Sequence, residues 1–164
     1  MSKHIVYLAL GSNLGDRLGN LRSAREALFP QVEILACSSV YETPPWGFTN
    51  QPAFYNQVLR GATALSPHEL LAHVKKVELV LGRAPTFKNG PRLIDIDILY
   101  YDDLVLATPE LALPHPRMEG RAFVWLPLAE LAPKMIDPLT GRYALEVAQS
   151  LDCGQISRVA VREC

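Results

Sequence analysis

The stretch GPRLIDIDIL, residues 90–99, sets two aspartates two positions apart inside an apolar run. Successive side chains of a β-strand point to opposite faces, so an extended chain here places Asp95 and Asp97 on one face and the isoleucines on the other. The two carboxylates would then stand roughly 6–7 Å apart at Cβ. Without compensation they repel each other, and water, a basic neighbour or a divalent cation can relieve that repulsion.

The plainest interpretation of this pair is an amphipathic strand with one solvated face. However, the residues that flank the aspartates on the same face, Leu93 and Leu99, are apolar, and Arg92 and Lys88 lie just upstream. Magnesium prefers a few carboxylates together with water and phosphate oxygens. The pattern therefore favours a metal–phosphate site over a solvated strand face.

No glycine-rich phosphate loop accompanies the aspartates. The segment GSNLGDRL lacks the Lys-Ser/Thr ending of a Walker A loop, and GxGxxG is absent. The phosphates of a bound nucleotide would then be held by metal and by basic side chains. Each basic residue taken singly is as consistent with an ordinary surface charge, so their clustering in two loops is the informative observation; the candidates are Arg83, Lys88, Arg92, His115, Arg117 and Arg121.

The apolar pattern predicts strands over residues 4–10, 32–42, 53–65 and 94–99. One helix follows a cap at Asp16 or Asn13, and Ser66 opens a second with a capping box. The order strand, helix, strand, strand, helix, strand is the ferredoxin-like βαββαβ pattern. A hairpin-like segment and two further helices are expected over residues 100–107, 123–131 and 144–151. We therefore predict one α+β domain over residues 1–164, a ferredoxin-like core with C-terminal hairpin and helical additions.

Composition excludes several classes of protein. The chain of 164 residues has a formal net charge of −1, which does not favour nucleic acid as a partner. Its three cysteines are odd in number and far apart, which argues against a disulfide framework or a zinc site and suits a reducing cytoplasm. The start lacks the apolar core of a signal peptide, and no window is long and apolar enough for a membrane span. We expect a cytoplasmic protein with no membrane partner.

Several blocks in order along residues 6–132 resemble the 6-hydroxymethyl-7,8-dihydropterin pyrophosphokinases of folate biosynthesis: ALGSNLGDR, VYETPPWG, PAFYNQV, VELVLGR, GPRLIDIDIL and LPHPRMEGRAFVWLPLAEL. That family transfers a pyrophosphoryl group from ATP to the hydroxymethyl group of the pterin and releases AMP. The resemblance implies ATP and a reduced pterin as substrates, two magnesium ions, and a monomeric enzyme.

The resemblance also implies roles for single residues. Asp95 and Asp97 match the pair that binds magnesium between ATP and pterin, and Arg83 and Arg92 match the catalytic arginines. Contacts to ATP are implied for Glu78, Lys88, Arg92, the backbone of Ile98, His115 and Arg121. Contacts to the pterin are implied for Thr43, Pro45, Trp46, Phe54, Asn56 and Phe123. The loop APTFKN, residues 84–89, departs from the family pattern, with Asn89 at the position of a tryptophan.

The residues agree with a pterin slot. A flat heterocycle needs aromatic faces and a few fixed polar groups, and Phe54 and Asn56 share one strand face. Without the family resemblance, an ordinary core aromatic and an ordinary strand polar residue would be the better interpretation. Loops over residues 43–52 and 83–92 flank the expected site, and we predict that they close over the substrates.

Two rival functions remain open at this point. One is a ferredoxin-like module that binds RNA or a small regulatory ligand, although no RNP-like aromatic motif is present. The other is an ordinary metal-dependent kinase that yields ADP. The nucleotide product separates all three possibilities, because the pyrophosphokinase yields AMP, the kinase ADP, and the module no turnover.

Overall fold

The computed structural model describes residues 2–45, 49–82, 92–160 and 164. Over these residues the elements follow in the order β1 (His4–Ser12), α1 (Arg17–Leu28), β2 (Val32–Cys37), β3 (Val40–Thr43), β4 (Phe54–Thr63), α2 (Pro67–Val80), β5 (Asp95–Tyr101), β6 (Leu106–Ala107), β7 (Ala112–Leu113), α3 (Ala122–Leu131), α4 (Ala144–Gln149) and β8 (Ser157–Ala160). None of the described helices has the length and apolar character needed to cross a membrane.

The main sheet has the strand order β5-β1-β4-β3-β8, and β2 also pairs with β4. All of these pairs are antiparallel. Because β2 and β3 follow each other in sequence and both pair with β4, they act as one interrupted strand. The core strands then lie in the order fourth, first, third, second, which is the split βαβ arrangement. The predicted α+β, ferredoxin-like fold is confirmed.

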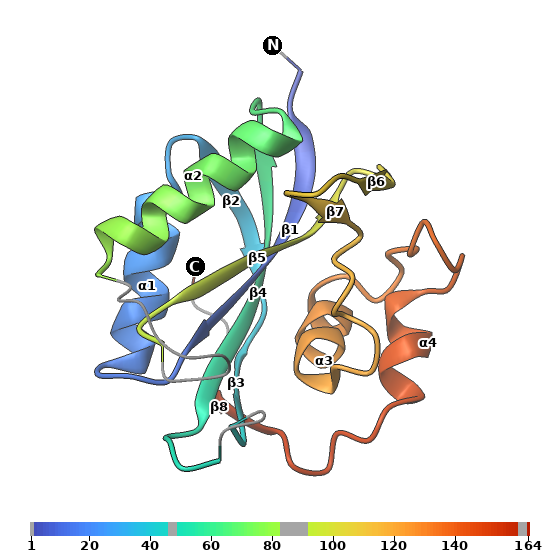
Figure 1. The fold of residues 1–164 in the computed structure, drawn as a ribbon. Helices are drawn as coiled ribbons and strands as arrows, with labels where there is room; N and C mark the ends of the chain where they lie inside the picture. Colours follow the sequence, from blue (N-terminus) through green and yellow to red (C-terminus); the bar gives the residue numbers. More distant parts are fainter. Residues whose placement is uncertain (1, 46–48, 83–91, 161–163) are drawn as a thin grey trace.

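Helices α1 and α2 cover one face of this sheet (Figure 1). Both begin where the sequence predicts, because their first N–H groups find side-chain acceptors. The Asp16 side chain accepts a hydrogen bond from the Gly19 N–H, and Ser66 and Glu69 form the predicted capping box. Asn13, the other candidate cap of α1, serves a different purpose described below.

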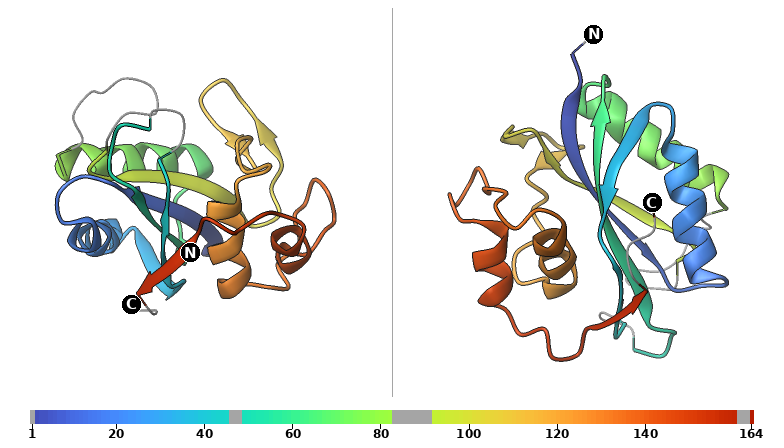
Figure 2. Two further views of the ribbon diagram at one scale, coloured as in Figure 1. Left: turned by 90° about the horizontal axis from the view of Figure 1, so that it is seen from below. Right: turned by 180° about the vertical axis from the view of Figure 1, so that it is seen from behind.

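The opposite face is covered by α3 and α4 over part of its area (Figure 2). On β5, Ile96 and Ile98 pack into the core under α1 and α2, whereas Leu99 and Tyr100 pack with α3 and α4. A register shift against β1 at Leu99 puts two consecutive residues on the α3 side. The face that carries the aspartates is therefore apolar beneath α3, and Asp95 and Asp97 lie beyond that cover.

Two element predictions need correction. The single strand expected over residues 32–42 is interrupted at Ser38 and Ser39, which separate β2 from β3. The hairpin expected over residues 100–107 lies further along, because β6 pairs with β7 and not with β5. Strand β8, which the sequence did not indicate, adds to the free side of β3.

The expectation of reduced cysteines is wrong for one pair. Cys37 and Cys164 form a disulfide across 127 positions of sequence, with their Cα atoms 6.1 Å apart. The odd number and wide spacing of the cysteines could not indicate this pair. The C-terminal strand β8 comes beside β3, which follows Cys37 closely, only in the folded chain. Cys153 is free.

Candidate active site

A cavity of about 180 Å³ opens on the sheet face that α3 and α4 leave partly uncovered. Alternate residues of neighbouring strands form its floor, since side chains two apart share a face. These are Ala9 and Gly11 of β1, Thr43 of β3, Phe54, Asn56 and Val58 of β4, and Asp95 and Asp97 of β5. Its walls include Lys75 and Glu78 of α2, Arg92, Arg117, and Arg121, Phe123 and Val124 at the start of α3.

Each aspartate has a basic neighbour. Arg92 Nε lies 3.4 Å from Asp95 Oδ2, and His115 Nε2 lies 3.7 Å from Asp97 Oδ1. The two carboxyl side chains retain 33% and 39% of their exposure, so both reach the cavity. The solvated-strand interpretation is therefore incomplete, because basic side chains converge on these carboxylates.

Gly11 lies between the acidic and the amide parts of the floor. It is paired with Asp95 on one side and with Asn56 on the other. A Cβ atom at this position would come within 3.2 Å of Asn56 Oδ1 and 3.7 Å of the Phe54 ring. Glycine thus keeps the middle of the floor low enough for a flat ligand to lie beside Asn56.

The amide of Asn56 is held in one orientation, because its Nδ2 donates to Thr43 Oγ1 at 2.8 Å. The second N–H and the oxygen of the same amide therefore also have fixed directions. Phe54 and Phe123 line the same cavity from β4 and from the first turn of α3. Two rings and one fixed amide are the elements that bind a flat, polar heterocycle.

Positive charge also lines the cavity, and the Arg121 guanidinium lies over the Phe123 ring, 5.6 Å from its centroid. Burial lowers the pKa of Arg121 below its usual value, with Arg117 acting in the same direction and Asp97 opposing it. Burial also lowers the pKa of His115, an effect opposed by Asp97 and reinforced by Arg117, Arg121 and Lys75. The two arginines, Arg117 and Arg121, stand close enough to disfavour each other's charge, and an anion bound between them would relieve that repulsion.

Glu78 supports the edge strand of the site. Its carboxylate is buried, with 2% exposure for the residue, and accepts the Ile96 N–H at 2.9 Å and a bond from Lys75 Nζ at 3.4 Å. The carboxylate thereby satisfies a backbone donor on β5 between the two aspartates. Satisfying this buried donor helps to hold the strand in place.

The structure brings most of the residues selected from the sequence into this one cavity. Pro45 lines an adjoining cavity of about 230 Å³ with Thr43 and Phe123. The side chain of Ile98 is buried in the core, and His115 is positioned beside Asp97. Arg83, Trp46 and Lys88 lie outside the described residues, as do residues 46–48 and 83–91 of the two loops expected to close over the substrates.

Asn13 is a site-supporting residue that sequence reasoning missed. Its fully buried side chain accepts the Arg92 N–H at 2.7 Å and donates to Gln51 Oε1 and to the Pro52 carbonyl, while its N–H donates to the Arg92 carbonyl. It thus joins the end of β1 to both loops that flank the cavity. Sequence reasoning also missed Lys75 as a residue of the cavity wall, because the pair Lys75-Lys76 on a helix is typical of a solvent-exposed face.

The acidic pair fits magnesium better than a metal held by protein alone. Among the described residues, no group of three or more His, Cys, Asp and Glu side chains could hold a metal ion. Two carboxylates facing one cavity leave coordination positions open for phosphate oxygens and water, as magnesium sites at nucleotides require. Asp95 and Asp97 are the residues that would hold such an ion.

Comparisons with known proteins relate the chain to one enzyme family. A family model described as 7,8-dihydro-6-hydroxymethylpterin-pyrophosphokinase (HPPK) matches residues 7–133. The chain is 51% identical over 134 residues to the 2-amino-4-hydroxy-6-hydroxymethyldihydropteridine pyrophosphokinase of Aquifex aeolicus, covering 82% of this chain and 84% of that protein. It is 47% identical over 135 residues to the folic acid synthesis protein FOL1 of Dictyostelium discoideum, covering 82% of this chain and 20% of that protein.

Among solved structures, the wild-type HPPK-DHPS of Plasmodium falciparum with pteroate has a TM-score of 0.76 at 16% identity, over 91% of this chain and 42% of that chain. This likeness shows the fold. The chain therefore spans about a fifth of the Dictyostelium protein and less than half of the Plasmodium chain, but most of the Aquifex protein. By its family match and its curated relatives, the chain belongs to the 7,8-dihydro-6-hydroxymethylpterin-pyrophosphokinase family.

Proposed function

We propose that this chain transfers the pyrophosphoryl group of ATP to the hydroxymethyl group of 6-hydroxymethyl-7,8-dihydropterin, releasing AMP in folate biosynthesis. The observation that carries the proposal is a single cavity with two halves. One half presents the Phe54 ring and the fixed amide of Asn56, and the other presents the aspartate pair beside Arg92. Such a cavity can hold a flat heterocycle against a polyphosphate.

In this proposal the pterin lies between Phe54 and Phe123 and is oriented by Asn56. Its hydroxyl oxygen bonds to the β-phosphorus of ATP, the bond from that phosphorus to the bridging oxygen of AMP breaks, and the hydroxyl proton is released. Arg92, Arg117 and Arg121 bind the phosphates and offset the charge that grows on their oxygens. Asp95 and Asp97 would hold magnesium, which would supply further charge neutralisation and alignment.

The nucleotide product tests the reaction. Incubation of the protein with ATP, magnesium and the reduced pterin should yield AMP and the pterin diphosphate, separated by ion-exchange chromatography. ADP as the product would instead support an ordinary kinase. Absence of any turnover, with the pterin still bound, would support a binding module.

Further assignments belong to the same proposal. Arg83 acts in catalysis, Lys88 binds ATP, and Trp46 and Pro45 contact the pterin through the loop after β3. Glu78, His115 and the backbone of Ile98 contact the nucleotide. Two magnesium ions bind, and residues 1–164 act as one monomeric domain. The cytoplasmic location stays a prediction, and the Cys37–Cys164 disulfide is an observation against a strongly reducing compartment.

Replacing Phe54 by Ala tests the pterin slot. We expect pterin binding to weaken by about 1–3 kcal/mol, the range of aromatic stacking on nucleic-acid bases. Binding of a non-hydrolysable ATP analogue should barely change, because the Phe54 ring carries no charge to offer the phosphates. Titration calorimetry with each ligand measures both effects.

Tyr55→Ala is the matched control, because Tyr55 is the next residue of β4 and its ring packs under the Arg17 guanidinium, 3.8 Å from the ring centroid. This variant should leave pterin affinity within about twofold of the wild type. Equal losses of both ligands in Phe54→Ala would make Phe54 a packing residue and contradict the slot.

A further inference from the structure

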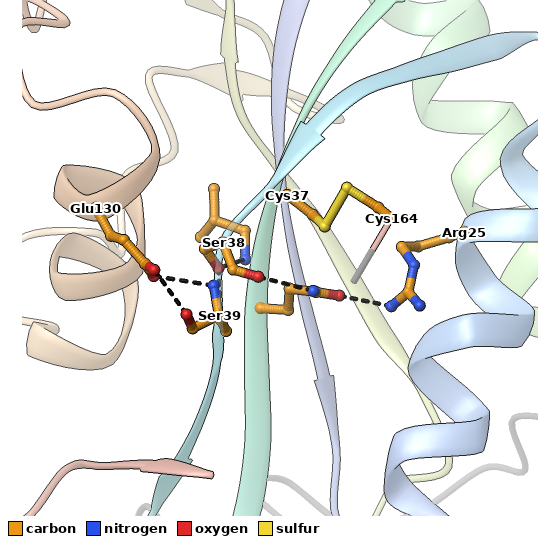
Figure 3. The surroundings of a disulfide bond; sticks show 8 residues. Arg25, Cys37, Ser38, Ser39, Glu130 and Cys164 are labelled. Carbon is orange, nitrogen blue, oxygen red and sulfur yellow. Dashed lines mark hydrogen bonds between the residues drawn. A yellow bond between two sulfur atoms is a disulfide. The ribbon is translucent and has the colours of Figure 1, made fainter. Parts of the chain in front are cut away.

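We infer that Glu130 is a positioning residue for the pterin, an inference that rests on the proposed function. Its carboxylate, at the end of α3, accepts two hydrogen bonds from Ser39, in the segment that links β2 to β3, and one from Tyr41 of β3. The donors are the Ser39 N–H at 2.9 Å, the Ser39 hydroxyl at 2.6 Å and the Tyr41 hydroxyl at 2.8 Å (Figure 3 shows the Ser39 pair). We call Glu130, Ser39 and Tyr41 the Glu130 clamp.

The clamp lies at the break between β2 and β3, where the regular pairing with β4 is interrupted. Ser38 and Ser39 separate β2 from β3, and both are buried. The Ser38 N–H still donates to the Val58 carbonyl of β4. Side chains supply the other bonds: the Ser38 hydroxyl accepts the Val58 N–H, the Ser38 carbonyl accepts Gln57 Nε2, and Glu130 accepts the Ser39 N–H. A carboxylate is needed here, because two donors of one residue and a tyrosine hydroxyl converge on it.

The network continues to the other side of the sheet. Gln57 Oε1 accepts a hydrogen bond from Arg25 Nη1 of α1 at 2.8 Å. Figure 3 shows this line of contacts from Arg25 through the amide beside Ser38, with Ser39 and Glu130 on the α3 side. Hydrogen bonds to Gln57 and Val58 of β4 thereby fix the break at Ser38 and Ser39 relative to the sheet, and Glu130 fixes α3 relative to this break.

Both walls of the pterin slot depend on the elements that the clamp joins. Phe123 is seven residues before Glu130 on the same helix, about 10 Å along its axis. Tyr41 pairs with Asn56, and β3 ends at Thr43, which holds the Asn56 amide. The clamp therefore sets the position of the Phe123 wall relative to the Asn56 wall.

Apolar packing alone would set this position less sharply. The face of α3 toward the sheet is formed by buried aliphatic and aromatic residues, namely Val124, Trp125, Leu128 and Ala129. Such contacts are non-directional and permit small shifts of a helix along its axis. Three hydrogen bonds to one carboxylate are directional, and a displacement of about 1 Å at a reacting group can cost up to 100-fold in rate.

The test compares Glu130→Ala and Glu130→Gln with a matched control, Asp137→Ala. Asp137 is also a buried carboxylate that accepts three hydrogen bonds, from the Tyr100 hydroxyl and from the N–H groups of Leu139 and Thr140. It contacts no residue of the cavity in these bonds. Each full-length variant is assayed for pterin KM, kcat, direct pterin binding, affinity for a non-hydrolysable ATP analogue, and thermal unfolding.

We expect Glu130→Ala to raise the pterin KM and Kd about 10-fold, with the affinity for the ATP analogue within about twofold of the wild type. Glu130→Gln keeps one acceptor oxygen and should recover part of the loss. Asp137→Ala should lower the melting temperature comparably and leave pterin affinity unchanged. If the clamp were purely structural, Glu130→Ala and Asp137→Ala would have the same pterin affinity and similarly lowered melting temperatures.

Pterin affinity within twofold of the wild type in folded Glu130→Ala, or an equal loss in Asp137→Ala, would overturn the inference. If Glu130→Ala does not fold, Tyr41→Phe replaces it, because it removes one donor with little change of shape. We expect Tyr41→Phe to raise the pterin Kd. An unchanged Kd with a lowered melting temperature would contradict the positioning role. Absence of AMP production by the wild type would instead contradict the proposed function. Direct pterin binding does not depend on turnover, so it tests the positioning role separately.

Discussion

Asp97→Asn should lower the rate of AMP release by about 10²–10³-fold, the range found when one group that stabilises transition-state charge is removed. The substitution keeps size and polarity but removes one negative charge from the acidic pair. The lost interaction strengthens as charge develops in the transition state, so kcat should fall more than substrate affinity. The dependence of rate on magnesium concentration should shift to higher concentrations, because one of the two carboxylates that would hold the ion is gone.

Stability in EDTA separates this role from a structural one. Asp97 is partly exposed, and its closest basic neighbour, His115, is 3.7 Å away, so the carboxylate contributes at most about 1 kcal/mol to the metal-free fold. Chemical denaturation of both proteins in EDTA should therefore give nearly the same free energy of unfolding. Relief of the repulsion from Asp95 acts in the stabilising direction.

Asp103→Asn is the control for this experiment, because Asp103 is exposed in the turn after β5 and lies outside the cavity. It should turn over at the wild-type rate. Near wild-type turnover in Asp97→Asn would rule out the metal role of this carboxylate. A large loss of metal-free stability would make the acidic pair a structural feature.

Asn13→Ala should produce the second large effect, on turnover and on stability together. The substitution leaves the Arg92 N–H without its acceptor and removes the donors to Gln51 and Pro52. An unsatisfied buried donor costs about 1–3 kcal/mol, and the lower end of this range applies to the Arg92 N–H because it is part-buried. The bond from the Asn13 N–H to the Arg92 carbonyl remains, but the Arg92 N–H loses its acceptor. The Arg92 guanidinium is then held less firmly beside Asp95, and turnover should fall by about 10–100-fold.

Two further variants assign the effect to its contacts. Asn13→Asp keeps an acceptor for the Arg92 N–H but cannot donate to Gln51 or Pro52, so it separates support of the Arg92 segment from support of the Gln51 segment. Asn20→Ala is the control, because Asn20 Nδ2 donates to Ser12 and Leu14 in the same turn without reaching either loop. AMP-release assays and urea denaturation measure all three proteins. Turnover of Asn13→Ala within threefold of the wild type would limit Asn13 to a structural role.

Much of the fold could be predicted from the sequence because its signals are local. The capping box at Ser66, the cap at Asp16 and the alternation along β4 and β5 each depend on residues within a few positions. The order of these elements then allowed the βαββαβ core to be predicted. The break at Ser38 and Ser39 could not be predicted, because it is stabilised by Gln57 and Glu130, which are distant in sequence.

The candidate site divides in the same way. The sequence alone determined that Asp95 and Asp97 share a face, because alternation is a property of any extended backbone. Only the tertiary structure decided what that face meets: α3 covers Leu99, and Arg92 and His115 approach the carboxylates. The contacts of Asn13 with Arg92, of Glu130 with Ser39 and of Cys37 with Cys164 span 79, 91 and 127 positions. Side chains that far apart meet only once the sheet and its helices have packed, and no local pattern of residue types records such a meeting.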